Sequence, residues 1–423
     1  MTRKWLIIGI GVKRWIVLGA IGNLSFALGI VLALDLLDDV FDRRWLAVIA
    51  LWLCGLYIIA TAFYKLSRNL LAPYRRYQHG RVVDVVYAHR QRGKGLKVVA
   101  IGGGTGLPAV LRGLKAHTSN ITAIVTVADD GGSSGQLRRA LGVLPPGDLR
   151  SNVVALADDE SLMTQLFQYR FNHGGDLGGH AFGNLFIAAL AGISGGLDVA
   201  LPEIERVLNI QGRVLPSTLD DVELVAKVRL RTKNRVIRVQ GESKIGQMDG
   251  RIEEMMIVPP DAMAYHQSVQ AILEADLIVI GPGSLYTSIL PNLLVKGIQD
   301  ALEQSKALKV YVCNVATQPG ETTQYSVADH VLALEKYIGE DVLQVVLANS
   351  ATPPANSATH YVAPAPDDHP VRQRYHLHYT DLTDVEHPWR HDPKKLAHAL
   401  IKLLDERTGY TEYTVSDPLN IED

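Results

Sequence analysis

Several loops in this sequence combine glycine with side chains suited to a phosphorylated ligand. The first, GGGTG, follows the apolar run Lys97 to Ile101 and precedes a helical pattern that begins at Pro108. Glycine lets a phosphate approach the backbone N–H groups at a helix N-terminus, where the helix dipole favours an anion. A tight strand-to-helix turn is the alternative, although it explains one glycine better than four. The loop lacks the Lys-Ser/Thr pair of a P-loop, and Leu107 breaks the G-x-G-x-x-G pattern.

Another loop, here called the DDGGSSG loop, runs from Asp129 to Gly135 and follows the strand pattern Ile121 to Val127. Adjacent carboxylates point in different directions, so one can face a ligand while the other braces the loop. Carboxylate oxygens and substrate phosphates are the usual ligands of Mg²⁺. Helix capping is the alternative, and it suits Ser134 better than both aspartates. Asp129 and Asp130 are therefore candidate catalytic residues and candidate Mg²⁺ ligands.

A second glycine-rich junction, Gly281 to Ser284, follows the strand pattern Asp276 to Ile280 and leads into a helical pattern. Two such junctions in one fold are more specific evidence for an anion site than either alone. In an open α/β sheet, ligands bind beyond the carboxyl ends of the strands, which is where both loops lie.

Two further segments place polar side chains near predicted helix starts. PPGDLRSN supplies Asp148, a candidate cap, and Arg150, which pairs either with an anion or with Asp148. GGHAFGN supplies His180 and Asn184. A packed histidine beside a tight turn is the alternative for His180.

Other kinds of catalytic site find little support. The sequence has no H-E-x-x-H motif and no cysteine cluster, which argues against zinc. It has no nucleophile elbow, and Cys54 and Cys313 are isolated in apolar runs. Covalent acyl chemistry and a disulfide scaffold are therefore unsupported.

The elements that must position these loops alternate between strand and helix. Continuous β-branched runs of this kind belong to a parallel sheet covered on both faces. We expect a Rossmann-like, doubly wound, mostly parallel α/β sheet. Val222 to Thr232 and Arg235 to Gln240 alternate apolar with charged residues and predict a small antiparallel insert. The expected strands also include Lys309 to Cys313 and Val342 to Leu347; the expected helices are Asp261 to Glu274, Leu285 to Ser305, Val327 to Tyr337 and a closing helix, Pro393 to Asp405.

Residues 1–66 have the features of a membrane anchor. Trp15 to Leu34 and Trp45 to Tyr64 each contain 20 uncharged residues, enough to cross a hydrocarbon core of about 30 Å. Lysine and arginine flank the pair on its outer sides, and four aspartates lie between them. The positive-inside rule then places both termini and residues 97–423 in the cytoplasm of a two-span, multi-pass cell-membrane protein.

Residues 67–96 form a basic juxtamembrane linker. Lys65 to Lys97 contains nine basic residues and one Asp, Asp84. The segment either lies on anionic membrane lipids or is a solvated linker whose charges set topology. Arg81 to Ala88 within it also fits an edge strand.

Charge separates the two parts of the chain. The net charge of 42 − 44 = −2 hides +10 in residues 1–97 and −12 in the remainder. An acidic body argues against nucleic acid as its partner. With 47% hydrophobic and 20% charged residues, an intrinsically disordered chain is excluded.

The motifs together resemble a known family. VVAIGGGTGLPAVLRGLK, VTVADDGGSSGQLRRALGVLPPGDLRSNVVALA, GGHAFGNLFIAAL, EADLIVIGPGSLYTSILPNLLVKGI and CNVATQPGETTQYSVADH resemble the gluconeogenesis factor (YvcK-like) family, similar in fold to the 2-phospho-L-lactate transferases (CofD). The resemblance spans Lys97 to Leu404. It implies a sugar-nucleotide ligand, UDP-N-acetylglucosamine, and a role in cell envelope synthesis, morphogenesis and growth on gluconeogenic carbon. The transferase relatives imply the alternative, a Mg²⁺-dependent phosphotransferase.

The resemblance also implies which residues bind the nucleotide. The two glycine loops would hold the diphosphate, Asn184 would lie near the ligand, and Arg390 and Tyr361 would be weaker contacts. The implied binding residues are Gly102, Gly103, Gly104, Thr105, Gly106, Asn184, Gly281, Pro282, Gly283, Ser284, Tyr361 and Arg390. No tightly bound cofactor is expected beyond Mg²⁺, and the expected partners are envelope-synthesis proteins, membrane lipids and a second copy of the chain.

Overall fold

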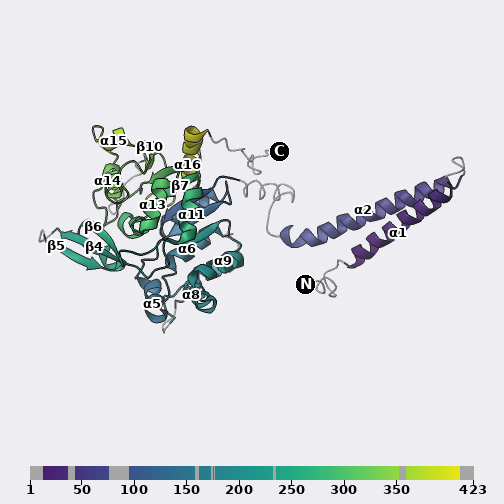
Figure 1. The fold of residues 1–423 in the computed structure, drawn as a ribbon, viewed down its shortest axis with the longest axis horizontal. Helices are drawn as coiled ribbons and strands as arrows, with labels where there is room; N and C mark the ends of the chain where they lie inside the picture. The colour runs from purple at the N-terminus through teal and green to yellow at the C-terminus, as the bar shows by residue number, and fades with distance from the viewer. Residues whose placement is uncertain are drawn as a thin grey trace. The chain divides into compact units, whose positions relative to one another are not determined.

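The computed structural model describes residues 13–36, 43–75, 95–157, 162–172, 175, 177–231, 235–351 and 359–409. They form two units, an N-terminal helical hairpin and an α/β domain (Figure 1). The predicted edge strand at Arg81 to Ala88 and most of the basic linker lie outside the described residues.

The hairpin consists of α1 (Lys13–Asp35) and α2 (Trp45–Arg75). Both contain segments long and apolar enough to cross a membrane, at residues 17–34 and 45–65. Large apolar side chains point away from the helix contact; Leu24 is 72% exposed. Gly22 and Gly55 let the backbones approach closely, because a Cβ at Gly55 would lie 3.0 Å from the Gly22 carbonyl oxygen. Small residues at the contact are typical of helices that pack in lipid.

The main sheet of the α/β domain has seven strands, and all of their pairings are parallel. The strand order is β10-β9-β8-β7-β1-β2-β3. The predicted fold class is therefore confirmed. The strands are β1 (Val98–Gly102), β2 (Ile121–Val125), β3 (Arg213–Pro216), β7 (Leu277–Ile280), β8 (Leu308–Val312), β9 (Val345–Asn349) and β10 (His376–Thr380).

Helices cover both faces of this sheet, and each face has its own core. Residues of β1 alternate between the two cores: Val98 and Ala100 belong to one, Val99 and Ile101 to the other. On the first face lie α4 (Leu107–Leu114), α6 (Gly147–Leu156), α7 (Leu162–Gln168), α8 (Phe182–Ser194), α9 (Leu197–Leu208) and α16 (Pro393–Thr408). On the second lie α11 (His266–Glu274), α12 (Leu290–Leu293), α13 (Lys296–Gln304), α14 (Val327–Ile338) and α15 (Val371–Arg374).

The predicted antiparallel insert is a three-stranded sheet of order β5-β4-β6. Its strands are β4 (Glu223–Leu230), β5 (Val236–Gln240) and β6 (Gly250–Val258), and the short helix α10 (Glu242–Ile245) follows β5. The sequence analysis did not predict β6. Buried residues of the insert join the core on the second face of the main sheet.

The structure differs from the predicted elements at the helix after β7. Leu285 to Ser305 is not one helix: a π-helical turn η2 (Leu285–Ile289) precedes α12 and α13. Pro291 lies in the first turn of α12, and the extended backbone of Val295 separates α12 from α13. Proline lacks an N–H and is tolerated only in a first turn, so the chain starts a new helix there.

Candidate functional site

The two glycine loops lie side by side because their strands are neighbours. β1 pairs with β2 on one side and with β7 on the other, so the strand order reverses between β1 and β7. A Cβ at Gly106 would lie 2.4 Å from the Pro282 carbonyl oxygen, and a Cβ at Gly103 would lie 2.7 Å from the Cβ of Ser288. Only glycine allows this close packing of one loop on the other. The predicted site residues from residue 102 to 106 and from 281 to 284 are thus brought together.

Asp148 in α6 closes one side of the first loop. The Gly104 N–H donates to its carboxylate, and a Cβ at Gly104 would lie 2.5 Å from Asp148 Oδ1. Asn152, one turn later, donates from Nδ2 to the carbonyl oxygen of Gly103 at 3.1 Å. Burial, and then the charge of Asp129, raise the pKa of Asp148 to about 7.

Asp129 and Asp130 have separate roles in the DDGGSSG loop. Asp130 Oδ1 accepts from the Ser243 N–H at 2.8 Å and so caps α10 of the insert. Asp129 Oδ1 accepts from the Gly131 N–H at 2.8 Å, while its charge acts on Asp148 and on Glu242. Asp129 thus contacts its own loop and Asp130 contacts the insert; that one of them faces a ligand remains a prediction.

Two carboxylates that sequence analysis missed complete this acidic region. Glu242 comes from the insert; burial and the charges of Asp129 and Asp148 raise its pKa to about 8. Glu321 comes from the segment after β8, and burial raises its pKa also. Both residues are far from the glycine loops in sequence, and only the fold brings them to the site. Glu321 lies in the segment CNVATQPGETTQYSVADH, but the sequence analysis did not predict it as a site residue.

The predicted Mg²⁺ would have to be held here jointly with phosphate. Among the described residues, no group of three His, Cys, Asp or Glu side chains could hold a metal ion. Mg²⁺ commonly takes one or two carboxylates and completes its shell with phosphates and water. Asp129 and Asp148, whose charges act on each other, would be the two carboxylates; Asp130 Oδ1 instead accepts from the Ser243 N–H of the insert.

A series of hydrogen-bonded polar side chains lies on the opposite side of the DDGGSSG loop. Arg150 donates from Nε to Asn184 Oδ1 at 2.8 Å, and Asn184 Nδ2 donates to Ser133 Oγ at 3.0 Å. Ser133 Oγ also forms a hydrogen bond with His180 Nδ1, 2.9 Å away. Of the two partners proposed for Arg150, Asp148 makes no hydrogen bond with it among the described residues. Burial, and then the nearby charge of Arg170, lower the pKa of Arg150, whereas the charge of Asp148 raises it. An anion here would offset the repulsion between Arg150 and Arg170.

This series of side chains meets the N-terminus of α5 (Gly132–Leu141). No side chain caps that helix. Within the described part of the chain, the N–H groups of Gly132, Ser133 and Ser134 have no hydrogen-bond acceptor. Such a helix start favours an anion. Asn184, predicted to lie near the ligand, is 2% exposed and holds Ser133 in place at this point.

The other two predicted contacts lie at the margin. Tyr361 forms a bridge with Ala316, just after β8. Arg390 is exposed in the segment between β10 and α16. Its neighbour His391 is buried, and His391 Nε2 lies 3.1 Å from the carbonyl oxygen of Cys313 at the end of β8. That contact fastens the Arg390 segment to the carboxyl end of the sheet.

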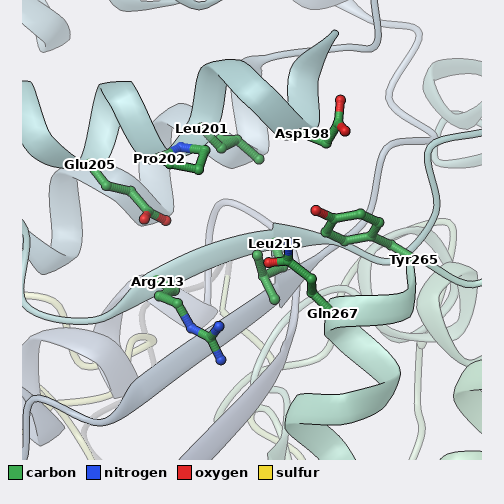
Figure 2. A pocket seen from close by; sticks show the side chains of 8 residues that line it. All are labelled: Asp198, Leu201, Pro202, Glu205, Arg213, Leu215, Tyr265 and Gln267. Atoms are coloured by element: carbon green, nitrogen blue, oxygen red, sulfur yellow. The ribbon is translucent and has the colours of Figure 1, made fainter.

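An enclosed cavity elsewhere is too small for a nucleotide. It lies between α9 and β3, where Glu205, Arg213 and Tyr265 line it (Figure 2). Its volume is about 40 Å³, enough for a few waters at most. Glu205 Oε1 accepts from the Val214 N–H on the sheet edge at 2.8 Å, and burial raises the pKa of Glu205 to about 7.

Comparison with known proteins identifies the family. Residues 98–407 match the model of the family described as 2-phospho-L-lactate transferase CofD. A relative from Nostoc sp. is 42% identical over 428 residues, covering 94% of this chain and 92% of its own length. The gluconeogenesis factor of Bacillus subtilis is 44% identical and covers 73% of this chain and 98% of its own.

A solved structure agrees with these sequence relatives. The crystal structure of a UPF0052 family member from Bacillus halodurans is 40% identical, with a TM-score of 0.67. It covers 73% of this chain and 100% of its own length. The matched share is that of the Bacillus subtilis relative, whereas the Nostoc match must extend into the N-terminal hairpin. The chain therefore belongs to the gluconeogenesis factor family and carries that family's CofD-like domain.

Proposed function

We propose that this protein is a membrane-tethered regulator that binds a sugar nucleotide, UDP-N-acetylglucosamine, in the cytoplasm. The ligand lies across the loops that follow β1, β2 and β7. Occupancy of this site controls partners in cell envelope synthesis, morphogenesis and carbon metabolism. The choice of UDP-N-acetylglucosamine follows from the sequence resemblance.

The observation that carries the proposal is the direct contact of two glycine loops where the strand order reverses. Gly106 packs on Pro282 there, at a place where a side chain cannot fit. Beside them, the uncapped start of α5 offers N–H groups, and Arg150 offers a positive charge. Nucleotides bind α/β sheets at such points, with phosphate at helix N-termini.

The hairpin supports the tether. Its two helices expose apolar side chains over lengths that span a hydrocarbon core. Lysines and arginines flank the pair on the side that the positive-inside rule assigns to the cytoplasm. A two-span anchor would keep the binding domain near envelope-synthesis enzymes at the membrane.

One observation favours a second candidate, a Mg²⁺-dependent phosphotransferase of the phospholactate type. Asp129 and Asp148 lie beside the first glycine loop, and their mutual charge helps to raise the pKa of Asp148. Phosphoryl-type transfers depend on positioning and charge more than on a protein nucleophile. Two such carboxylates with Mg²⁺ would suffice for that chemistry.

Calorimetric titration of the full chain in detergent separates the candidates. The ligands are UDP-N-acetylglucosamine, UDP and GDP, each with and without Mg²⁺. Tight binding of the uridine sugar, with the ligand recovered intact, supports the regulator. A preference for GDP, or consumption of the ligand, supports the transferase. Binding of none of them contradicts both.

A further inference from the structure

The helix N-terminus beside the second glycine loop already has a hydrogen-bond acceptor from the chain itself. Glu321, 8% exposed, accepts from the Tyr286 N–H at 3.2 Å and from Thr287 Oγ1 at 2.9 Å. Both partners belong to η2, directly after Ser284. A helix start without such a partner offers its N–H donors to a phosphate. At η2, Glu321 already takes the Tyr286 N–H, so a phosphate placed there would meet a carboxyl group instead.

Two residues of the segment after β8 also contact the second glycine loop, residues 281–284. Asn314 accepts from the Gly283 N–H at 3.0 Å and donates to the Gly283 carbonyl at 2.8 Å, which occupies both polar groups of that glycine. Gln318 donates from Nε2 to Ser284 Oγ at 2.8 Å. Gln318 Oε1 is buried and has no hydrogen-bond partner among the described residues. A buried acceptor without a donor is costly unless a ligand supplies one.

The DDGGSSG loop, at the start of α5, has a different character. The start of α5 keeps the N–H groups of Gly132, Ser133 and Ser134 without acceptors among the described residues, and Arg150 adds a cation. Phosphate is an acceptor and an anion, so it suits α5. The acceptors at Gln318 and Glu321 suit a neutral group that donates hydrogen bonds.

We propose that the second glycine loop binds the ribose hydroxyls of the nucleotide, and that the diphosphate lies over the first loop and the start of α5. Gln318 Oε1 and the Glu321 carboxylate accept from the two vicinal hydroxyls. This orientation rests on the proposed function, because it assumes a nucleoside diphosphate as the ligand. It assigns a role in specificity to Gln318 and Glu321, which the sequence analysis did not predict as site residues.

The first test uses the unmodified full chain in detergent and changes only the ligand. UDP, 2′,3′-dideoxy-UDP and inorganic pyrophosphate are titrated under the same conditions. We expect dideoxy-UDP to bind at least about tenfold more weakly than UDP, the size expected for one lost buried hydrogen bond. Equal affinity for UDP and dideoxy-UDP would overturn the orientation.

A variant then locates the hydroxyls. Gln318→Leu keeps the volume of the side chain and removes the acceptor. It should weaken UDP about tenfold and leave dideoxy-UDP and pyrophosphate within about twofold of the unmodified protein. Equal weakening of UDP and dideoxy-UDP would place the hydroxyls elsewhere and overturn the proposal.

A second variant guards against misfolding of the first and tests the phosphate position. Glu321→Gln keeps hydrogen-bonding atoms and removes the charge. If phosphate occupies the second loop, this change strengthens pyrophosphate binding about tenfold, which contradicts our orientation; we expect no strengthening. Loss of UDP binding by the unmodified protein itself would overturn the proposed function and this inference with it, whereas normal UDP binding without the hydroxyl effect overturns only the inference.

Discussion

The two glycine loops are alike in sequence and differ in the side chains of the chain that contact them. Both follow buried strands, both precede helical turns, and they touch where Gly106 meets Pro282. Beside the second loop, Glu321 occupies the N-terminus of η2. At the first loop, the Asp148 carboxylate takes only the Gly104 N–H. Thr105 and Gly106 keep N–H groups with no acceptor among the described residues.

The difference teaches that a glycine loop reports close approach and does not by itself report phosphate. Glycine at residue 106 is required because one backbone packs on another. Whether the helix start then takes a ligand's phosphate depends on side chains from elsewhere in the fold. At the second loop that side chain is Glu321.

The largest expected effect comes from breaking the contact between the loops. Gly106→Ala places a Cβ 2.4 Å from the Pro282 oxygen, so we expect a loss of about 3 kcal/mol in the free energy of unfolding. Gly102→Ala is the matched control, because its nearest neighbour would be Leu107 Cβ at an ordinary 3.4 Å. Denaturant unfolding followed by circular dichroism measures both. Equal stability of the two variants would mean that the loops do not depend on this contact.

The next prediction concerns the pH dependence of stability that Asp148, beside the first glycine loop, contributes to the domain. Folding raises the pKa of Asp148 from 3.8 to about 7, so the folded state holds the proton more tightly. Its contribution to stability is full below the lower value and is lost as pH rises toward the higher one, on the order of 1 kcal/mol per pH unit. Asp148→Asn should flatten that part of the profile.

Mg²⁺ with UDP provides the control for this pH effect. Bound cation stabilises the ionised carboxylate, so it should remove the loss due to Asp148. Glu205, whose pKa is also raised to about 7, lies by the small cavity away from the loops. The pH dependence of stability due to Glu205 is the part that Glu205→Gln removes. We expect Mg²⁺ with UDP to leave that part unchanged. A response there would show that the ion acts on the whole domain.

A smaller effect distinguishes the adjacent aspartates. Asp129→Asn should weaken Mg²⁺-dependent binding of UDP about tenfold, because it removes a charge that faces Asp148 and Glu242. Asp130→Asn keeps an oxygen to accept from the Ser243 N–H, so binding should change less than about threefold. Calorimetric titration with and without Mg²⁺ measures both. The reverse ranking would exchange their roles.

The smallest effect concerns the clamp on the second loop alone. Asn314→Ala removes both hydrogen bonds to Gly283, and we expect a loss of about 1 kcal/mol in the free energy of unfolding. Affinity for pyrophosphate should stay the same, because the diphosphate lies over the other loop. Weaker pyrophosphate binding would show that the second loop does touch phosphate.

The centre of the sheet could be predicted from the sequence, and its edges could not. Strands β1, β2, β7 and β8 are buried on both faces and appear as continuous apolar runs. The edge strands β3 and β10 were missed, because RVLP contains a proline and HLHYT has polar, partly exposed side chains. An edge strand needs fewer apolar residues, since only one neighbour covers its backbone.

The site shows the same limit. The sequence indicated the glycine loops and the aspartates, because each lies in a continuous segment between a strand and a helix. Glu242, Glu321 and Gln318 were missed, since each acts on a loop far away in the chain: Thr287 Oγ1, for example, donates to Glu321 across 34 residues. Only the tertiary fold gives such residues a partner.

The central position of β1 has a consequence for the time at which the site is made. Val98 pairs with Leu277, and the Lys97 N–H donates to Asp276, 179 residues later. A ribosome that adds about 5 to 20 residues each second needs roughly ten seconds or more to bridge that distance. During that interval the hairpin has left the ribosome while β1 still lacks one neighbour. A site built from the loops after both β1 and β7 is therefore complete only once synthesis has passed β7.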